Sequence, residues 1–142
     1  MAIAQAVCNS FKQQILEGVH NFATGGNVFK LSLYTSAANL SASTTVYTST
    51  NEVANTGQYT AGGGTLTGQQ TSLDTGVAIV DFADLSFTGV TLTAAGALIY
   101  NTSASNKAVA VLSFGGDKTA TSGTFTILFP AFTAANAILR IA

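Results

Sequence analysis

The sequence has few charged residues and almost no cysteine, histidine or proline. Only 8% of its 142 residues are charged, whereas about a quarter of the residues of a typical globular protein carry a charge. Five Lys and Arg against six Asp and Glu give a net charge of −1, so there is no basic surplus to neutralise phosphates. The composition therefore argues against nucleic-acid binding. A net charge near zero also gives little repulsion between copies of the chain.

Cysteine and histidine are too scarce for two common kinds of stabilising site. Cys8 is the only cysteine and His20 the only histidine, so an intramolecular disulfide and a Cys/His zinc site are both excluded. A calcium site is not expected either, because neither Asp74 nor Asp117 lies in a loop of alternating oxygen ligands. We expect no bound metal and no cofactor.

Neither an export signal nor a membrane span is predicted. The apolar stretch at residues 2–8 is short, has no basic region before it and is followed by polar residues from Lys12 onward. A transmembrane helix needs about 20 mostly apolar residues, and every candidate run is interrupted well before that length. We expect a protein that is made in a cytoplasm and has no membrane partner.

The first 24 residues have the spacing of an amphipathic helix. The apolar positions fall within an arc of roughly 160° on a helical projection, and they are Ile3, Val7, Phe11, Ile15, Val19 and Phe22. His20 lies on the polar side, so we expect it to be solvated or at an interface, and we expect Cys8 to be a small buried hydrophobic residue. The apolar stripe must face either the protein's own sheet or a neighbouring subunit.

From residue 28 onward the hydrophobic period changes from 3.6 to 2. Phe29, Leu31 and Leu33 alternate with more polar residues, which is typical of a strand with one buried face. Comparable runs recur at residues 44–50, 77–82, 86–93, 97–102, 108–114, 123–129 and 137–141. This pattern predicts a single, mainly β domain (residues 1–142). Its fold would be an antiparallel β-sandwich or jelly-roll-like barrel at residues 28–142, preceded by one N-terminal helix at residues 1–24.

Two glycine-rich segments interrupt the strand pattern. Residues 51–73 are predicted to form a long loop with a short strand at residues 65–67. Residues 115–123 are predicted to form the tip that joins two long strands.

No arrangement of catalytic residues emerges from the sequence. Asp81 and Asp84 are three residues apart in an extended segment, so they point to opposite faces and do not form an acid–base pair. His20 is distant in sequence from the serine-rich turns, which argues against a nucleophilic triad. Residues 116–119 lack the preceding glycine of a phosphate-binding loop and lie between strands. We expect neither enzymatic activity nor a small-molecule substrate.

The tyrosines and the single arginine are the remaining candidates for specific contacts. Tyr34, Tyr47, Tyr59 and Tyr100 could form a ligand platform, although a position at the rim of a sheet or between subunits is more common. Arg140 lies in an apolar strand near the end of the sequence. Its position predicts a specific pairing with an acidic group on this chain or an adjacent one.

Several separated motifs resemble a family of small virion structural proteins of tailed bacteriophages and prophages. The motifs are VCNSFKQ at residues 7–13, LEGVH at 16–20, GQYTAGG at 57–63, FADLSF at 82–87, AGALIYN at 95–101 and FGGDK at 114–118. They follow one another along nearly the whole chain. The resemblance implies a component of the phage particle, with capsid decoration or cement as the expected role. A tail or fibre protein that contacts other tail proteins or the host surface is the alternative. The family brings no catalytic residues.

The resemblance and the composition together predict the contacts of such a protein. A decoration protein binds many copies of the major capsid protein and stabilises the shell by mass action, and exposed strand edges and long loops can pair with a neighbour. We expect a homo-oligomer located in the virion and made in the host cytoplasm. The predicted contact residues are Phe11, Ile15 and Val19 of the helix stripe, Gln58, Tyr59 and Thr60 of the long loop, and Arg140.

Overall fold

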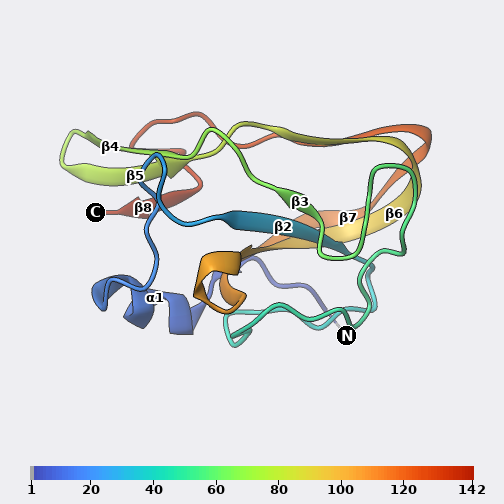
Figure 1. Cartoon of the computed structure of the whole chain (residues 1–142), viewed down its shortest axis with the longest axis horizontal. Helices are drawn as coiled ribbons and strands as arrows, with labels where there is room; N and C mark the ends of the chain where they lie inside the picture. Colours follow the sequence, from blue (N-terminus) through green and yellow to red (C-terminus); the bar gives the residue numbers. More distant parts are fainter. Residues whose placement is uncertain (1) are drawn as a thin grey trace.

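A computed structural model describes residues 2–142 and shows a mainly β architecture with one helix near the N-terminus (Figure 1). The larger sheet has the strand order β1 (Ala6–Val7), β7 (Lys107–Ile127), β6 (Leu85–Asn101), β2 (Phe29–Tyr34) and β3 (Gly64–Thr65). The smaller sheet has the order β4 (Gln70–Asp74), β5 (Val77–Asp81) and β8 (Leu139–Ile141). Neighbouring strands are antiparallel throughout. The predicted fold class, antiparallel β-sheets with one N-terminal helix, is confirmed.

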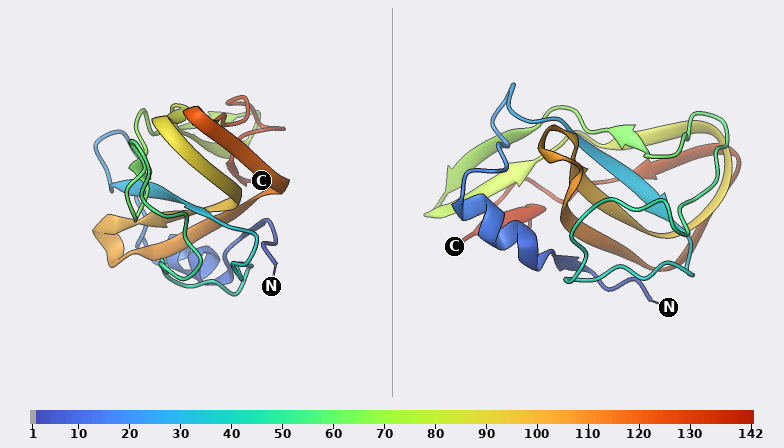
Figure 2. Two further views of the ribbon diagram at one scale, coloured as in Figure 1. Left: turned by 90° about the vertical axis from the view of Figure 1, so that its right-hand side faces the viewer. Right: turned by 60° about the horizontal axis from the view of Figure 1, so that its bottom comes forward.

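The scaffold of the molecule is a long hairpin made by β6 and β7, which contain 17 and 21 residues. The pairing register shifts at several points along the hairpin, and such bulges bend and twist strands. Both strands therefore curve, so that their two halves lie in different layers of the molecule (Figure 2). The prediction of four short strands here, with a tip at residues 115–123, is wrong. Gly115 and Gly116, with φ of 75° and 144°, bend a continuous strand instead of reversing the chain.

The chain reverses between β6 and β7 at a short 3₁₀ helix, η1 (Thr102–Ala104). The Asn101 side chain accepts a hydrogen bond from the Ser103 N–H at its start. Ser105 and Asn106, with φ of 55° and 59°, complete the turn in the left-handed region.

The N-terminal helix is much shorter than the sequence pattern predicts. Helix α1 covers Asn9–Leu16, and residues 6–7 before it form strand β1 against β7. Gly18, with φ of 73°, ends the helix in a Schellman arrangement, because its N–H bonds Ile15 O and the next N–H bonds Gln14 O. Phe11 and Phe22 are buried in the core cluster, so the protein's own sheet covers much of the apolar stripe.

Residues 44–50 and 51–73 also differ from prediction. The expected strand at residues 44–50 is irregular chain with one bridge, Val46 to Lys107. The predicted long loop contains β3, which overlaps the short strand predicted at residues 65–67, and all but the last residue of β4, which was not predicted. Strand β4 escaped sequence analysis because its residues are nearly all exposed, and an exposed strand shows no hydrophobic alternation.

One cluster of buried apolar side chains fills the space beneath the larger sheet. Its most compact part is aromatic, with the rings of Phe22 and Phe29 stacked at 4.4 Å and Phe82 edge-on to both. Cys8 is fully buried, as predicted, and this burial raises the pKa of its thiol to about 11. No helix within residues 2–142 is long and apolar enough to cross a membrane.

Candidate interaction surface

A hollow of about 810 Å³ lies between helix α1 and one face of the smaller sheet. We call it the helix groove. The helix and strands β5 and β8 lie at the same end of the molecule (Figures 1 and 2). Apolar side chains from both elements line the groove, namely Phe11, Ile15 and Leu16 from the helix and Ala78, Val80, Leu139 and Ile141 from the sheet.

The apolar character of this sheet face follows from strand register. Ala78 is paired with Leu73 on one side and with Ile141 on the other, so these three side chains form one row on one face. Leu73 is 72% exposed and Ile141 is 61% exposed. Across the groove, Leu16 at the end of the helix is 88% exposed. Large aliphatic side chains therefore remain in solvent together at this end of the molecule, which is typical of an interaction surface.

The opposite face of the smaller sheet is covered by the chain at residues 131–137. Asp74 Oδ2 accepts a hydrogen bond from the Ala134 N–H at 2.7 Å, and Arg140 Nη1 donates to the Ala134 carbonyl at 2.9 Å. Arg140 therefore does make a specific contact, but its partner here is a main-chain carbonyl and not the predicted acidic group. The contact fixes the segment that leads into β8.

The three predicted helix residues have different environments. Phe11 is buried against His20 and Phe22, with ring centroids at 4.9 and 5.9 Å, so it forms the inner wall of the groove rather than an exposed contact. Ile15 is half-buried and lines the groove. Val19 is half-buried beyond the end of the helix, after Gly18. Leu16 is not among the predicted contact residues because it falls off the stripe, yet it is the most exposed aliphatic side chain of the helix.

The predicted contact loop lies at the other end of the molecule (Figure 1, green). Gln58 and Thr60 are exposed, and Gln58 is bonded to the main chain of Thr88. The prediction that Tyr59 makes a surface contact is wrong, because Tyr59 is completely buried. Its hydroxyl accepts from the Leu33 N–H at 2.8 Å and donates to Glu52 Oε2 at 2.6 Å.

The tyrosines surround Glu52 and do not form a platform or rim. The Glu52 carboxylate accepts hydrogen bonds from the hydroxyls of Tyr47 and Tyr59 and from the Gly62 N–H. Tyr100 donates to the Gly62 carbonyl at 2.6 Å, and Tyr34 donates to the Thr48 carbonyl at 2.6 Å. We call these residues the Glu52 network, and it attaches the irregular chain at residues 47–62 to the larger sheet.

The environment of the Glu52 network keeps its hydroxyls protonated. Burial raises the pKa of Tyr34 and Tyr100 to about 12. Burial and the hydrogen bond to Glu52 raise the pKa of Tyr47 and Tyr59 as well. The tyrosine hydroxyls therefore act as hydrogen-bond donors, and those of Tyr47 and Tyr59 hold the Glu52 carboxylate in place.

His20 is buried in a second polar network, which contradicts its predicted place in solvent or at an interface. Its Nδ1 lies 3.0 Å from the Asn101 amide nitrogen, a donor, and its Nε2 lies 2.8 Å from Gln14 Oε1, an acceptor. This pattern fits a neutral ring protonated at Nε2. Burial and, second, the charge of Lys107 lower the pKa of His20 to about 4. The helix ends at Leu16, and the chain after it brings His20 against Asn101 at the end of β6, which sequence spacing did not reveal.

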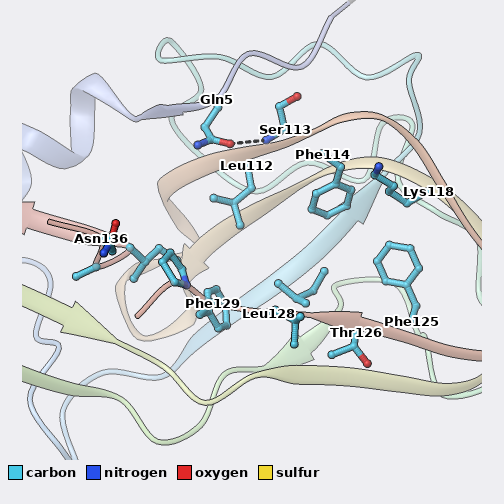
Figure 3. Close-up of a pocket in the computed structure, with 14 residues that line it drawn as sticks. Gln5, Leu112, Ser113, Phe114, Lys118, Phe125, Thr126, Leu128, Phe129 and Asn136 are labelled. Atoms are coloured by element: carbon cyan, nitrogen blue, oxygen red, sulfur yellow. Dashed lines mark hydrogen bonds between the residues drawn. The ribbon is translucent and has the colours of Figure 1, made fainter. Parts of the chain in front are cut away.

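A second hollow of about 670 Å³ lies on the open side of the sandwich (Figure 3). The bend of β7 places Leu112 and Phe114 from its first half opposite Phe125 from its second half, with the two phenylalanine rings 6.0 Å apart. Gln5 accepts a hydrogen bond from the Ser113 N–H at one side of it. Figure 3 shows mainly apolar side chains turned toward the hollow, with Lys118 at its margin.

Across residues 2–142, no group of three or more His, Cys, Asp or Glu side chains is placed to hold a metal ion. No protein-family model matches the chain, and no match is found among curated proteins or solved structures. The phage resemblance of the sequence motifs therefore stays a prediction.

Proposed function

We propose that this chain is a non-enzymatic structural protein of a tailed-bacteriophage particle, a decoration or cement protein that binds the major capsid protein. The contact surface in this proposal is the end of the molecule that carries the helix groove. The observation that supports it most strongly is the joint exposure of Leu16, Leu73 and Ile141 beside one apolar groove. Full burial of such side chains contributes about 1.5–3 kcal/mol each.

The distribution of charge also suits a protein that docks on a large surface. Lys12 and Arg140 are the charged residues among those that line the groove, and the Arg140 guanidinium is bonded to Ala134 on the other face of the sheet, so docking in the groove removes few ions from water. This matters because the desolvation of charge opposes association. A protein that binds the assembled shell and not its separated subunits stabilises the shell in proportion to its binding free energy.

The copy number in purified particles tests the proposal directly. A cement protein covers a lattice, so quantitative mass spectrometry of particles from cells that carry this gene is expected to give a copy number comparable with that of the major capsid protein. A few copies per particle would favour the tail or fibre alternative. Absence from purified particles would contradict the proposal in both forms.

A matched pair of variants tests which end of the molecule makes the contact. Leu16→Asp places a charge beside the helix groove, and Thr60→Asp places the same charge on the exposed loop at the other end. Both side chains are exposed, so both variants are expected to fold. Leu16→Asp is expected to lose incorporation into particles and Thr60→Asp to retain it. The reverse result would show that the loop, and not the groove, is the contact.

A further inference from the structure

Strand β4 has a free edge whose hydrogen-bonding groups can be assigned from its turn. Thr75 and Gly76, with φ of 50° and 84°, form a two-residue turn between β4 and β5, and Asp74 pairs with Val77 across it. A turn of this kind is closed by a hydrogen-bonded pair, and bonded and non-bonded pairs alternate from there. Gln70, Ser72 and Asp74 therefore bond to β5. Thr71 and Leu73 direct their N–H and C=O groups away from it.

The outermost strands of the two sheets, in the described part of the chain, are protected except for β4. Gln58 and Thr56 bond to the main chain of Thr88 and Thr91 on the part of β6 that β2 does not reach. Strand β8 has only three residues and carries Arg140. Strand β7 bends at Gly115 and Gly116 and carries Asp117 and Lys118. Strands β1 and β3 have two residues each. Strand β4 pairs with β5 over five residues without a register shift, contains no proline, and is charged only at its last residue. Regular edges with few charges, no proline and no bulge are the ones that pair with another chain.

We propose that two copies of this chain pair antiparallel through their β4 edges, about a two-fold axis at Ser72. In this register Thr71 of each copy lies opposite Leu73 of the other, so the outward N–H and C=O groups of both residues are bonded. Asp74 lies opposite Gln70 of the second copy, so no like charges face each other. A register centred on Thr71 would need Gln69, whose carbonyl already accepts from Thr24 Oγ1.

The same pairing joins the two apolar surfaces. A two-fold axis within a sheet is perpendicular to it, so both copies present the same face. The row of Leu73, Ala78 and Ile141 then continues into the row of Thr71, Val80 and Leu139 of the second copy. Both helix grooves open on one side of a continuous sheet. The inference refines the proposed function, since a dimer with two grooves on one side can lie flat on a particle, but it is tested on the isolated protein.

Disulfide trapping tests the register. Residues 72 of the two copies form a non-hydrogen-bonded pair, whose Cα atoms lie about 4.5 Å apart, within the range that a disulfide spans. The only native thiol, Cys8, is fully buried and does not compete. Under mild oxidation, Ser72→Cys is expected to form a covalent dimer at least about ten-fold faster than Thr124→Cys, an exposed control on β7. Equal rates for the two variants would overturn the proposal.

Charge substitution at the axis gives an independent readout. Ser72→Lys and Ser72→Glu are each expected to sediment at half the mass of the wild-type protein, because two like charges meet at the axis. Mixing the two variants is expected to restore the dimer mass. A monomeric wild type, or Ser72 variants that stay dimeric, would overturn the pairing. If Ser72→Cys forms the covalent dimer but purified particles lack the protein, the dimer proposal is supported and only the phage role is rejected.

Discussion

At one end of the molecule polar and aromatic side chains turn inward around Glu52, whereas at the other end aliphatic side chains stand in solvent around the helix groove. The hydroxyls of Tyr47 and Tyr59 bond to the half-buried Glu52 carboxylate and hold a long irregular segment in place. The side chains of Leu16, Leu73 and Ile141 are largely exposed, so they contribute little to the packing of the monomer. The comparison separates in space the Glu52 network, which stabilises the fold, from the surface that we propose for interaction. Substitutions in the Glu52 network should change folding, and substitutions of the exposed aliphatic side chains at the other end should change association.

The largest effect is expected from a charge on the buried side of helix α1. Phe11→Asp places a carboxylate against the neutral His20 ring and Phe22, and an unpaired buried charge costs several kcal/mol. We expect the variant to be unfolded at room temperature by circular dichroism. Leu16→Asp on the same helix is the control and should melt within a few degrees of the wild type. A folded Phe11→Asp protein would show that the helix is not packed as described.

A smaller loss of stability is expected from neutralising the carboxylate at the centre of the Glu52 network. Glu52→Gln replaces one of the two acceptor oxygens by an amide donor that faces a hydroxyl or an N–H group. Hydrogen bonds to charged groups contribute about 1.5–3 kcal/mol, so the free energy of unfolding in urea should fall by about 2–3 kcal/mol. Dimer formation by the folded variant should be unchanged. An unaltered unfolding midpoint would contradict the structural role of Glu52.

His20 should make stability depend on pH in a defined window. Burial and the charge of Lys107 lower its pKa to about 4 in the folded state, against 6.5 ordinarily. Between these values the unfolded chain takes up a proton that the folded chain does not. The free energy of unfolding should therefore fall by roughly 2 kcal/mol as pH is lowered from about 6.5 to about 4, and the contribution should be fully present above that window. The difference between the free energies of unfolding of the wild type and of His20→Gln, measured across this pH range, isolates the contribution of His20. Parallel pH profiles for the two proteins would contradict the prediction.

The smallest effect on stability is expected from a substitution at the free edge of strand β4. The same substitution is expected to have a large effect on association. Leu73→Lys changes a side chain that is 72% exposed, so the free energy of unfolding should change by less than about 0.5 kcal/mol. Its charge would stand beside the second copy's strand, and sedimentation should report a monomer. A dimeric Leu73→Lys protein would weaken the contrast between the two ends.

The fold class was accessible from the sequence because apolar residues recur with a period of two in segments such as residues 29–33. Phe29, Leu31 and Leu33 are fully buried in β2, as predicted, but Ser32 and Tyr34, predicted on a wetter face, are fully buried as well. The bend in β7 was not accessible, because Gly115 and Gly116 read as a turn whether the chain reverses or only curves. The length of the helix was misread for a related reason. The apolar period runs on through β1 and past Gly18, and packing against β7 decides where the helix begins.

The candidate surface was predictable only in part. The helix stripe led to Ile15 and to the inner wall at Phe11, both of which line the groove. The opposite wall is built from strands distant in sequence, so no local pattern could place Ala78 and Ile141 beside the helix. Tyr59 and His20 are buried, although both were predicted at the surface or at an interface. Tertiary structure supplies their hydrogen-bond partners, which are Glu52 and Leu33 for Tyr59 and Asn101 for His20.

The central claim is that the end of the molecule with the helix groove and strand β4 makes the contacts. A density map of purified particles, with the chain fitted into it, measures this most directly. The account predicts density of a neighbouring protein against Leu16 and Ile141, and a second copy across Ser72. A chain whose small sheet faces solvent while residues 57–63 touch the particle would contradict it.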